Sequence, residues 1–224
     1  SFGLLSEDVD FIKVMINDGE PSKFNLSRYT QIYKELLDRF EEEYRYSLKV
    51  GISTNPVINA FQGTVSKYNI DHALVDSFLK SMRTDLEKQN YDNQEEIDNY
   101  IYGSADVVGL MCLKVFVQGD DEKYNNLKEP AMKLGSAFQK VNFLRDLKDD
   151  FEVLNRTYFP NTDLNQLDEE SKIKIIDEIE GDFKEGLNGI KMLPIEAKFG
   201  VFMAYRYYSQ LLKKLKKTPA LDIK

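Results

Sequence analysis

Residues 139–160, QKVNFLRDLKDDFEVLNRTYFP, place a line of polar residues inside an otherwise apolar run. Gln139, Asn142, Asp146 and Asp150 are spaced by three, four and four residues, which is one stripe along a helix of 3.6 residues per turn, and Arg145 lies beside it. Most of the remaining circumference is apolar: Phe138, Val141, Phe143, Leu144, Leu147 and Phe151. A helix that is apolar nearly all round is buried, and an unpaired charge is costly to bury. The stripe therefore needs a partner or a ligand.

Helical periodicity dominates the rest of the chain, and the 42% hydrophobic content of its 224 residues is enough for one sizeable core. We expect helices over residues 28–50, 56–68, 69–88, 93–117, 130–154, 168–192 and 194–217. Residues 119–130 are expected to be a polar connector, and residues 155–166 a loop. Asn55 is the expected N-cap of the second helix, with Pro56 at its first position, and Asn69 or Asp71 begins the third. Since no repeat or linker interrupts this pattern, we expect one all-α domain over residues 1–224.

Bulk charge and cysteine content limit the partners. A net charge of −8 argues against nucleic acid, because phosphate binding needs clustered cations. The single cysteine, Cys112, excludes an intrachain disulfide and favours a reducing, cytoplasmic location, and its apolar surroundings predict a buried side chain. The cationic run at residues 213–217 has two interpretations. It is a solvated helix end, or it gives peripheral contact with the inner face of an anionic membrane.

Carboxylates four residues apart on one helix face can share a divalent cation. Mg²⁺, with Mn²⁺ as an alternative, prefers carboxylate oxygens and bridges to substrate phosphates, so Asp146 and Asp150 are candidate metal ligands for a diphosphate site. Arg145 could hold the same diphosphate, and Gln139 and Asn142 could bind phosphate oxygen or metal-ordered water. The apolar flanks would suit a hydrocarbon tail. An acidic pair at this spacing is also common on solvated helices, so a solvent-facing stripe on a helical interaction domain is the alternative.

Three ordered segments resemble the phytoene and squalene synthase family. NFLRDLKDD, residues 142–150, followed by RTYFP, residues 156–160, is similar to the family's second aspartate-rich motif. Residues 77–105 resemble the family's run from a helix carrying M-x-x-D to a tyrosine-rich helix start. YIYGSADVVGLMCLKVF, residues 100–116, is similar to the segment that lines the family's hydrophobic tunnel. The resemblance covers residues 33–220.

This resemblance implies an isoprenoid-synthase-like helical bundle around a central cavity, and head-to-head condensation of two prenyl diphosphates with Mg²⁺. It implies metal ligation by Asp146 and Asp150, with Gln139, Asn142 and Arg145 on the diphosphate side. It further implies cavity positions for Tyr100, Asp85, Tyr158, Ala105, Val108 and Gly109. Of these, Tyr100 would lie near the cyclopropyl carbocation, and the last three would make room for isoprenoid. From the residues alone, Tyr100 is equally a core aromatic, Asp85 a surface acid, and the small residues helix-packing positions.

The chain also departs from the family pattern. No first aspartate-rich motif is recognisable, since residues 6–18 offer only Glu7, Asp8, Asp10 and Asp18 without the family spacing. We therefore expect a prenyl synthase domain that lacks part of the usual N-terminal region, or else a divergent homologue with half a metal site. Phytoene formation from geranylgeranyl diphosphate is the expected reaction. The alternatives are squalene or dehydrosqualene formation from farnesyl diphosphate, and a non-catalytic isoprenoid-binding homologue. The sequence leaves the oligomeric state open.

Overall fold

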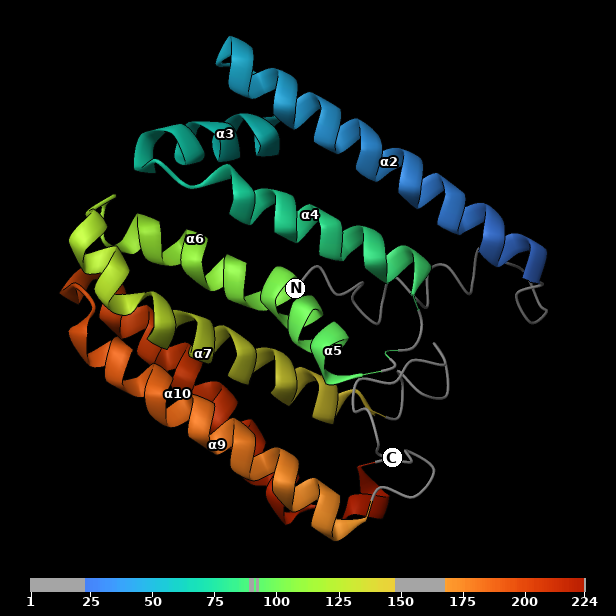
Figure 1. Cartoon of the computed structure of the whole chain (residues 1–224), viewed down its shortest axis with the longest axis vertical. Helices are drawn as coiled ribbons and strands as arrows, with labels where there is room; N and C mark the ends of the chain where they lie inside the picture. The colour runs from blue at the N-terminus through green and yellow to red at the C-terminus, as the bar shows by residue number, and fades with distance from the viewer. Residues whose placement is uncertain (1–22, 89–90, 92, 148–167, 224) are drawn as a thin grey trace.

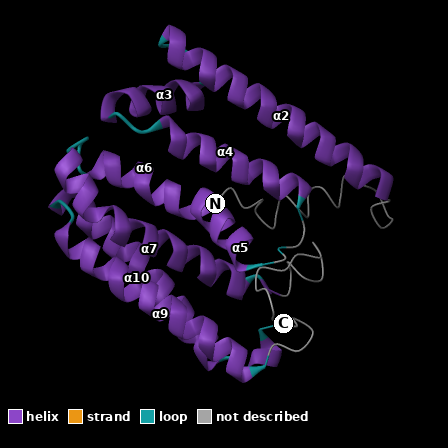
Figure 2. Cartoon of the chain, viewed as in Figure 1, coloured by secondary structure: helices purple, strands orange, loops and turns teal. Residues whose placement is uncertain are grey.

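The computed structural model describes residues 23–88, 91, 93–147 and 168–223, and every element within them is helical (Figures 1 and 2). The expected all-α fold is confirmed. The elements are α2 (Lys23–Val50), α3 (Pro56–Tyr68), α4 (His72–Glu87), α5 (Gln94–Ile101), the π-helical turn η1 (Tyr102–Asp106), α6 (Val107–Phe116), α7 (Asp121–Arg145), α9 (Glu169–Met192), α10 (Ile195–Lys217) and the 3₁₀ turn η3 (Ala220–Asp222).

The helices lie in successive layers, and α7 lies in the middle of the half that α6, α7, α9 and α10 form (Figure 1). On one side α7 packs against α6 and η1, and on the other against α9 and α10. The layer of α4 connects α6 and η1 to α2, which lies at the edge of the bundle beside α3. Because α7 separates two helical layers, its two faces decide what each layer can enclose.

The expected helix starts are confirmed where a capping side chain was visible in the sequence. Asn55 accepts hydrogen bonds from the backbone N–H groups of Val57 (3.0 Å) and Ile58 (3.3 Å). Asp71, not Asn69, caps α4 by accepting from the N–H of Ala73 at 2.9 Å. Asn69 instead ends α3 in the left-handed region, at φ 51°, which asparagine tolerates better than most residues.

The expected connector at residues 119–130 is wrong, because residues 121–130 form the first part of α7. The N-cap Asp120 accepts a hydrogen bond from the N–H of Lys123 at 3.0 Å. Two acids in the first turn stabilise the helix further through their interaction with the positive end of its dipole. Pro130 lies inside the helix, where proline normally costs a hydrogen bond and a clash. Its ring packs where Gly189 of α9 has no side chain, since a Cβ on Gly189 would lie 2.4 Å from the Cβ of Pro130.

The helix expected over residues 93–117 exists but is interrupted by η1. Asn93 caps α5 as the sequence suggests, accepting from the N–H of Glu96 at 3.0 Å. In η1, Gly103 fits against α4 only without a side chain, because a Cβ there would lie 2.8 Å from the carbonyl oxygen of Ser77. The wider turn changes the direction in which Ser104 and Ala105 project, and such π-turns are frequent at functional sites.

The end of α7 differs from the expectation of one continuous helix to residue 154. The helix ends at Arg145, and Asp146 is its C-cap, with φ −93° and ψ 9°. The N–H of Asp146 still donates to the carbonyl oxygen of Asn142 at 2.8 Å, which closes the last turn. Asp150 and Tyr158 lie outside the described residues, so the part of the stripe beyond Asp146 stays a prediction.

Helix α2 begins five residues earlier than expected and is buried over only part of its apolar side. Tyr44 is fully buried and Phe40 packs against the same cluster, but Ile32 and Leu36 are exposed. The N-terminal end of α2 extends past the end of α4 (Figure 1). Among the residues that the structure describes, no helix has the length and apolar content needed to cross a bilayer.

The contact between Pro130 and Gly189 gives a stability prediction. Gly189→Ala should lower the free energy of unfolding by about 1–3 kcal/mol, because the added methyl group overpacks a rigid proline ring. Gly181→Ala is the matched control in the same helix, since nothing lies within 4 Å of its Cβ position. That variant should gain about 0.5–1 kcal/mol from helix propensity. Urea unfolding of both variants checks the pair, and equal effects would contradict the packing argument.

Candidate functional site

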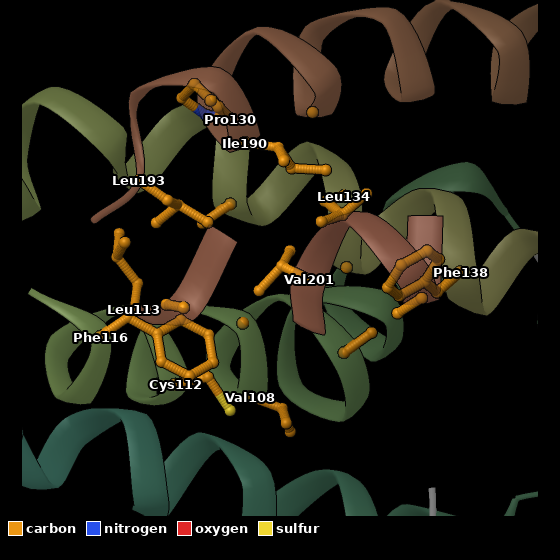
Figure 3. A pocket seen from close by; sticks show the side chains of 18 of the residues that line it. Val108, Cys112, Leu113, Phe116, Pro130, Leu134, Phe138, Ile190, Leu193 and Val201 are labelled. Carbon is orange, nitrogen blue, oxygen red and sulfur yellow. The ribbon is translucent and has the colours of Figure 1, made fainter. Parts of the chain in front are cut away.

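An elongated cavity of about 540 Å³ lies between α6, α7, α9 and α10. Figure 3 shows apolar side chains from all four helices around one space, with Phe116 and Leu193 toward one end and Phe138 toward the other. Helices α6 and α7 are joined by a short connection and pack against each other, so they run antiparallel. Ser104 and Asn142 therefore share one end of the cavity, and Phe116 and Leu127 share the other. Along α7, Asn142 and Leu127 are about 22 Å apart at 1.5 Å per residue.

The end at Ser104 and Asn142 is polar. Ser104, Gln139 and Asn142 line the cavity there. The Oγ of Ser104 and the Oδ1 of Asn142 are buried, and neither has a hydrogen-bond partner among the described residues. A buried polar atom without a partner costs about 1–3 kcal/mol, so such atoms are rare in folded proteins. Two of them at one end of an apolar cavity fit a ligand whose head group is polar and whose tail is apolar.

Five of the predicted site residues line this cavity: Gln139, Asn142, Ala105, Val108 and Gly109. Gly109 does more than leave room for a ligand, because a Cβ there would lie 3.0 Å from the carbonyl oxygen of Ala131 on α7. Gly135 of α7 similarly faces the carbonyl oxygen of Ala105, at 2.9 Å from its Cβ position. The two interpretations of these small residues, helix packing and cavity wall, therefore both hold.

Asp146 and Arg145 lie one turn beyond Asn142 and pair with each other. Arg145 donates from Nε to Oδ1 and from Nη2 to Oδ2 of Asp146, both at 2.6 Å. The hydrogen bonds that Arg145 donates to Asp146 raise the pKa of Arg145, and both side chains are partly exposed, at 43% for Arg145 and 39% for Asp146. Asp146 is thus paired with its neighbour and partly exposed, which corrects the expectation of a buried acid at this position of the stripe.

Two further predicted residues are not among those that line the cavity. Tyr100 is buried in an aromatic cluster with Tyr91 and Phe143, at ring-centroid distances of 5.2 and 6.1 Å. Phe143 follows Asn142 on α7, so the cluster supports the helix turn that carries the polar end. Asp85 lies in the last part of α4 and is partly buried.

Cys112 was expected to be a buried core residue, and that expectation is wrong. Its side chain is exposed and lines the cavity. Protein atoms still surround the thiol on most sides, so burial raises its pKa. The apolar run of α6 looked like core in the sequence because a cavity wall and a core face carry the same residue types.

A buried polar network on the far side of α7 was not recognised from the sequence. Asp182 of α9 is buried and accepts from Lys133 (3.0 Å) and Lys140 (2.7 Å) of α7. Beside it, Ser136 donates to Asp106 at 2.7 Å. Burial raises the pKa of Asp106 to about 6, although Ser136 and Lys140 favour its charged form. The seven-residue spacing of the two lysines was a visible signal, but lysine is usually a surface residue.

The described residues supply an incomplete donor set for a divalent cation. No group of three or more His, Cys, Asp or Glu side chains comes together among them. Asp146 lies one turn beyond Asn142, and both of its oxygens accept from Arg145. Asp150 and the N-terminal acids Glu7, Asp8 and Asp10 lie outside the described residues. A metal site that includes them is therefore a prediction.

The raised pKa of Asp106 predicts a pH-dependent stability. A carboxyl whose pKa is raised from 3.8 to about 6 binds its proton more tightly in the folded state, so it costs stability as pH rises through that window. Asp106→Asn removes this cost. Relative to the parent, the variant should gain up to about 3 kcal/mol in free energy of unfolding between pH 4 and pH 7. Urea unfolding at both pH values checks this, and a difference that does not change with pH would contradict it.

The unpaired oxygen of Asn142 gives a second prediction. Asn142→Leu should raise the free energy of unfolding by about 1 kcal/mol, because it removes a buried acceptor that has no partner. Asn126→Leu, an exposed position on the same helix, is the control and should change stability by less than about 0.5 kcal/mol. Thermal or urea unfolding measures both, and a loss of stability in Asn142→Leu would mean that the amide has a structural role.

Comparison with known proteins identifies the family. The sequence profile of squalene/phytoene synthases matches residues 25–223. The chain is 33% identical over 132 residues to the chloroplastic phytoene synthase 1 of Zea mays, covering 58% of this chain and 32% of that protein. It is 32% identical over 139 residues to the phytoene synthase of Arthrospira platensis, covering 58% and 44%. The match thus spans less than half the length of these two relatives.

Solved structures show the same fold. Squalene synthase HpnC from Alicyclobacillus acidocaldarius superposes with a TM-score of 0.69 at 24% identity, covering 81% of this chain and 72% of that one. A dehydrosqualene synthase solved in complex with a ligand superposes with a TM-score of 0.64 at 19% identity, covering 80% and 76%. Since the profile match extends over nearly all of the described residues, the chain belongs to the squalene/phytoene synthase family.

Proposed function

We propose that this protein condenses two prenyl diphosphates head to head, and that it forms phytoene from geranylgeranyl diphosphate. The observation that carries the proposal is the cavity, which is apolar over most of its length and has two unpaired buried polar atoms at one end. A prenyl diphosphate has the matching shape, with a charged head and a long hydrocarbon tail. The phytoene synthase relatives support the longer substrate.

Each part of the site has a role in this proposal. Ser104, Gln139 and Asn142 hold the polar head end, and Arg145 binds diphosphate oxygens once it exchanges its pairing with Asp146. The apolar wall, including Ala105, Val108 and Gly109, holds the hydrocarbon and keeps water away from an allylic cation. Tyr100, Asp85 and Tyr158 are proposed to act near the reacting centre, although Tyr100 and Asp85 are not on the cavity wall.

Asp146 and Asp150 are proposed to bind Mg²⁺. Bound there, the ion would neutralise the diphosphate and make it a better leaving group. For Asp146 to ligate a metal, its carboxylate must release at least one of the two hydrogen bonds from Arg145. Arg145 would then be free to turn toward a diphosphate, so both changes favour the same bound state.

Two alternatives have specific support. The structural neighbours are a squalene synthase and a dehydrosqualene synthase, which favours farnesyl diphosphate as substrate. A non-catalytic isoprenoid-binding protein is supported by the cavity itself, which fits an isoprenoid whether or not a metal site is complete. The cytoplasmic location stays a prediction.

Product analysis tests the reaction and the substrate together. The purified chain is incubated with Mg²⁺ and either geranylgeranyl or farnesyl diphosphate, and the extract is analysed by mass spectrometry. We expect a C40 hydrocarbon from the longer substrate. A C30 product from farnesyl diphosphate alone would replace phytoene by squalene or dehydrosqualene. No product from either substrate, in a chain that is folded by circular dichroism, would favour the isoprenoid-binding alternative.

Asp146→Ala should lower turnover at least about a hundredfold while leaving the fold intact, because it removes a proposed metal ligand. Asp177→Ala, an exposed aspartate on α9, is the matched control and should keep parental turnover. Asn142→Leu should lower turnover without lowering stability. Full activity of the Asp146 variant with Mg²⁺ would mean that the metal site is assigned to the wrong residues.

A further inference from the structure

The outward side of α2 carries a regular row of side chains, and the apolar members of that row stay exposed. Its six positions follow one another at alternating steps of four and three residues, as in the seam of a coiled coil: Ile32, Leu36, Arg39, Glu43, Tyr46 and Val50. The four apolar members are 39%, 52%, 63% and 46% exposed. We call these six residues the α2 seam. Because α2 lies at the edge of the bundle, an exposed apolar row there indicates an interaction surface (Figure 1).

Helix α2 is held in place by its other side. Tyr44 is fully buried, and its ring lies 5.4 Å from that of Phe61 on α3, measured between ring centroids. Arg45 pairs with Asp76 of α4 at 2.9 Å. Contacts to both neighbouring helices therefore fix the rotation of α2, so the α2 seam is presented outward on a rigid helix.

The two charged members at the middle of the α2 seam can each bind a further partner. Arg39 is exposed and takes part in none of the ion pairs recorded among the described residues. Glu43 accepts through Oε1 from the Oγ of Ser53 (2.5 Å) and from the N–H of Asn55 (3.3 Å), and no hydrogen bond to its Oε2 is recorded there. Within one helix, a cation that precedes an acid by one turn is the less favourable order. A partner outside the helix would therefore stabilise both charges.

The α2 seam is complementary to itself when a second copy of α2 is placed antiparallel to the first. In an antiparallel pair, the numbers of facing residues add up to one constant value, and a single register pairs the whole seam. Ile32 then faces Val50 of the second copy, Leu36 faces Tyr46, and Arg39 faces Glu43. Two-fold symmetry makes every contact occur twice, so two ion pairs lie at the centre with apolar contacts at both ends. A parallel pair in register would instead place Arg39 against Arg39.

We propose that this protein forms a two-fold symmetric dimer through the α2 seam, with the two copies of α2 antiparallel. The partner is a second copy because it supplies apolar, charged and apolar groups in the matching order. The contact would extend over residues 32–50, which is about 27 Å at 1.5 Å per residue. The proposal does not depend on the reaction that the cavity supports.

The charges that flank the α2 seam define this arrangement further. Glu35 and Lys49 are exposed on one flank, and the antiparallel register brings Glu35 beside Lys49 of the second copy. Glu42, exposed on the same flank, would lie close to the two-fold axis and face its own copy. Because two like charges repel there, Glu42→Gln should strengthen the dimer about twofold to threefold.

Sedimentation velocity over a range of protein concentrations tests the proposal, and we expect the parent chain to dimerise. Arg39→Glu and Glu43→Arg should each weaken the dimer at least about tenfold, because each turns both central ion pairs into like-charged pairs. An equimolar mixture of these two variants should form a heterodimer of about parental affinity, since both ion pairs are then present again. Leu36→Ser with Tyr46→Ser should weaken the dimer at least about tenfold through lost apolar contacts.

Matched controls separate the α2 seam from general effects of charge and apolar content. Arg206→Glu makes the same charge change at an exposed position of α10, and Ile173→Ser with Ile195→Ser removes two exposed apolar residues of α9 and α10. Both should dimerise like the parent, and circular dichroism melts establish that every variant is folded.

Three results would overturn the proposal. The first is a parent that stays monomeric up to about 0.1 mM, where even a weak specific dimer forms. The second is a dimer that the seam variants leave unchanged, which would place the interface on another face. The third is a mixture of Arg39→Glu and Glu43→Arg that forms no heterodimer. If the parent is monomeric and Leu36→Ser lowers its free energy of unfolding, residues of the same chain cover the α2 seam instead.

Discussion

The close approach of α7 to its neighbours is the constraint on which the rest of the structure depends. Gly186 and Gly189 of α9 have Cβ positions 3.0 and 2.4 Å from the Cβ atoms of Leu134 and Pro130 on α7. On the other side, Gly109 and Gly135 bring the backbones of α6, η1 and α7 nearly into contact. Because α7 is held this tightly along its length, the space at the corner of α6, α7, α9 and α10 persists as a cavity instead of collapsing. The same glycines therefore allow close packing along α7 and keep the space between the four helices open.

The two faces of α7 carry opposite chemistry. One face lines the cavity and is almost entirely apolar until Gln139 and Asn142. The other face carries Lys133 and Lys140, which share the buried carboxylate of Asp182 and fix the rotation of α7 against α9. A rotation of α7 that buried the lysines differently would leave Asp182 without a cation, which is costly inside a protein. The ion pairs thereby specify which face of α7 meets the cavity.

The polar end of the cavity is assembled from three elements. The π-turn η1 supplies Ser104, the last turns of α7 supply Gln139 and Asn142, and the C-cap places Asp146 and Arg145 just beyond. The aromatic cluster of Tyr91, Tyr100 and Phe143 supports that same turn from the other side.

The sequence by itself determined the helical fold class and the helix starts at Asn55 and Asn93, because caps and periodicity are local properties. It left Asn69 and Asp71 as alternatives for the start of α4, and only the family resemblance pointed to Ala105, Val108 and Gly109 as cavity positions. The sequence also determined the family, since the motifs lie in order along the chain. Only the tertiary structure decided that residues 121–130 are helical, because the room for Pro130 comes from Gly189, which is 59 residues away. It also decided that Cys112 faces a cavity, that Asp146 pairs with Arg145, and that Asp182 joins two lysines. Each of these depends on which surfaces meet, and that information is not local to any segment of the chain.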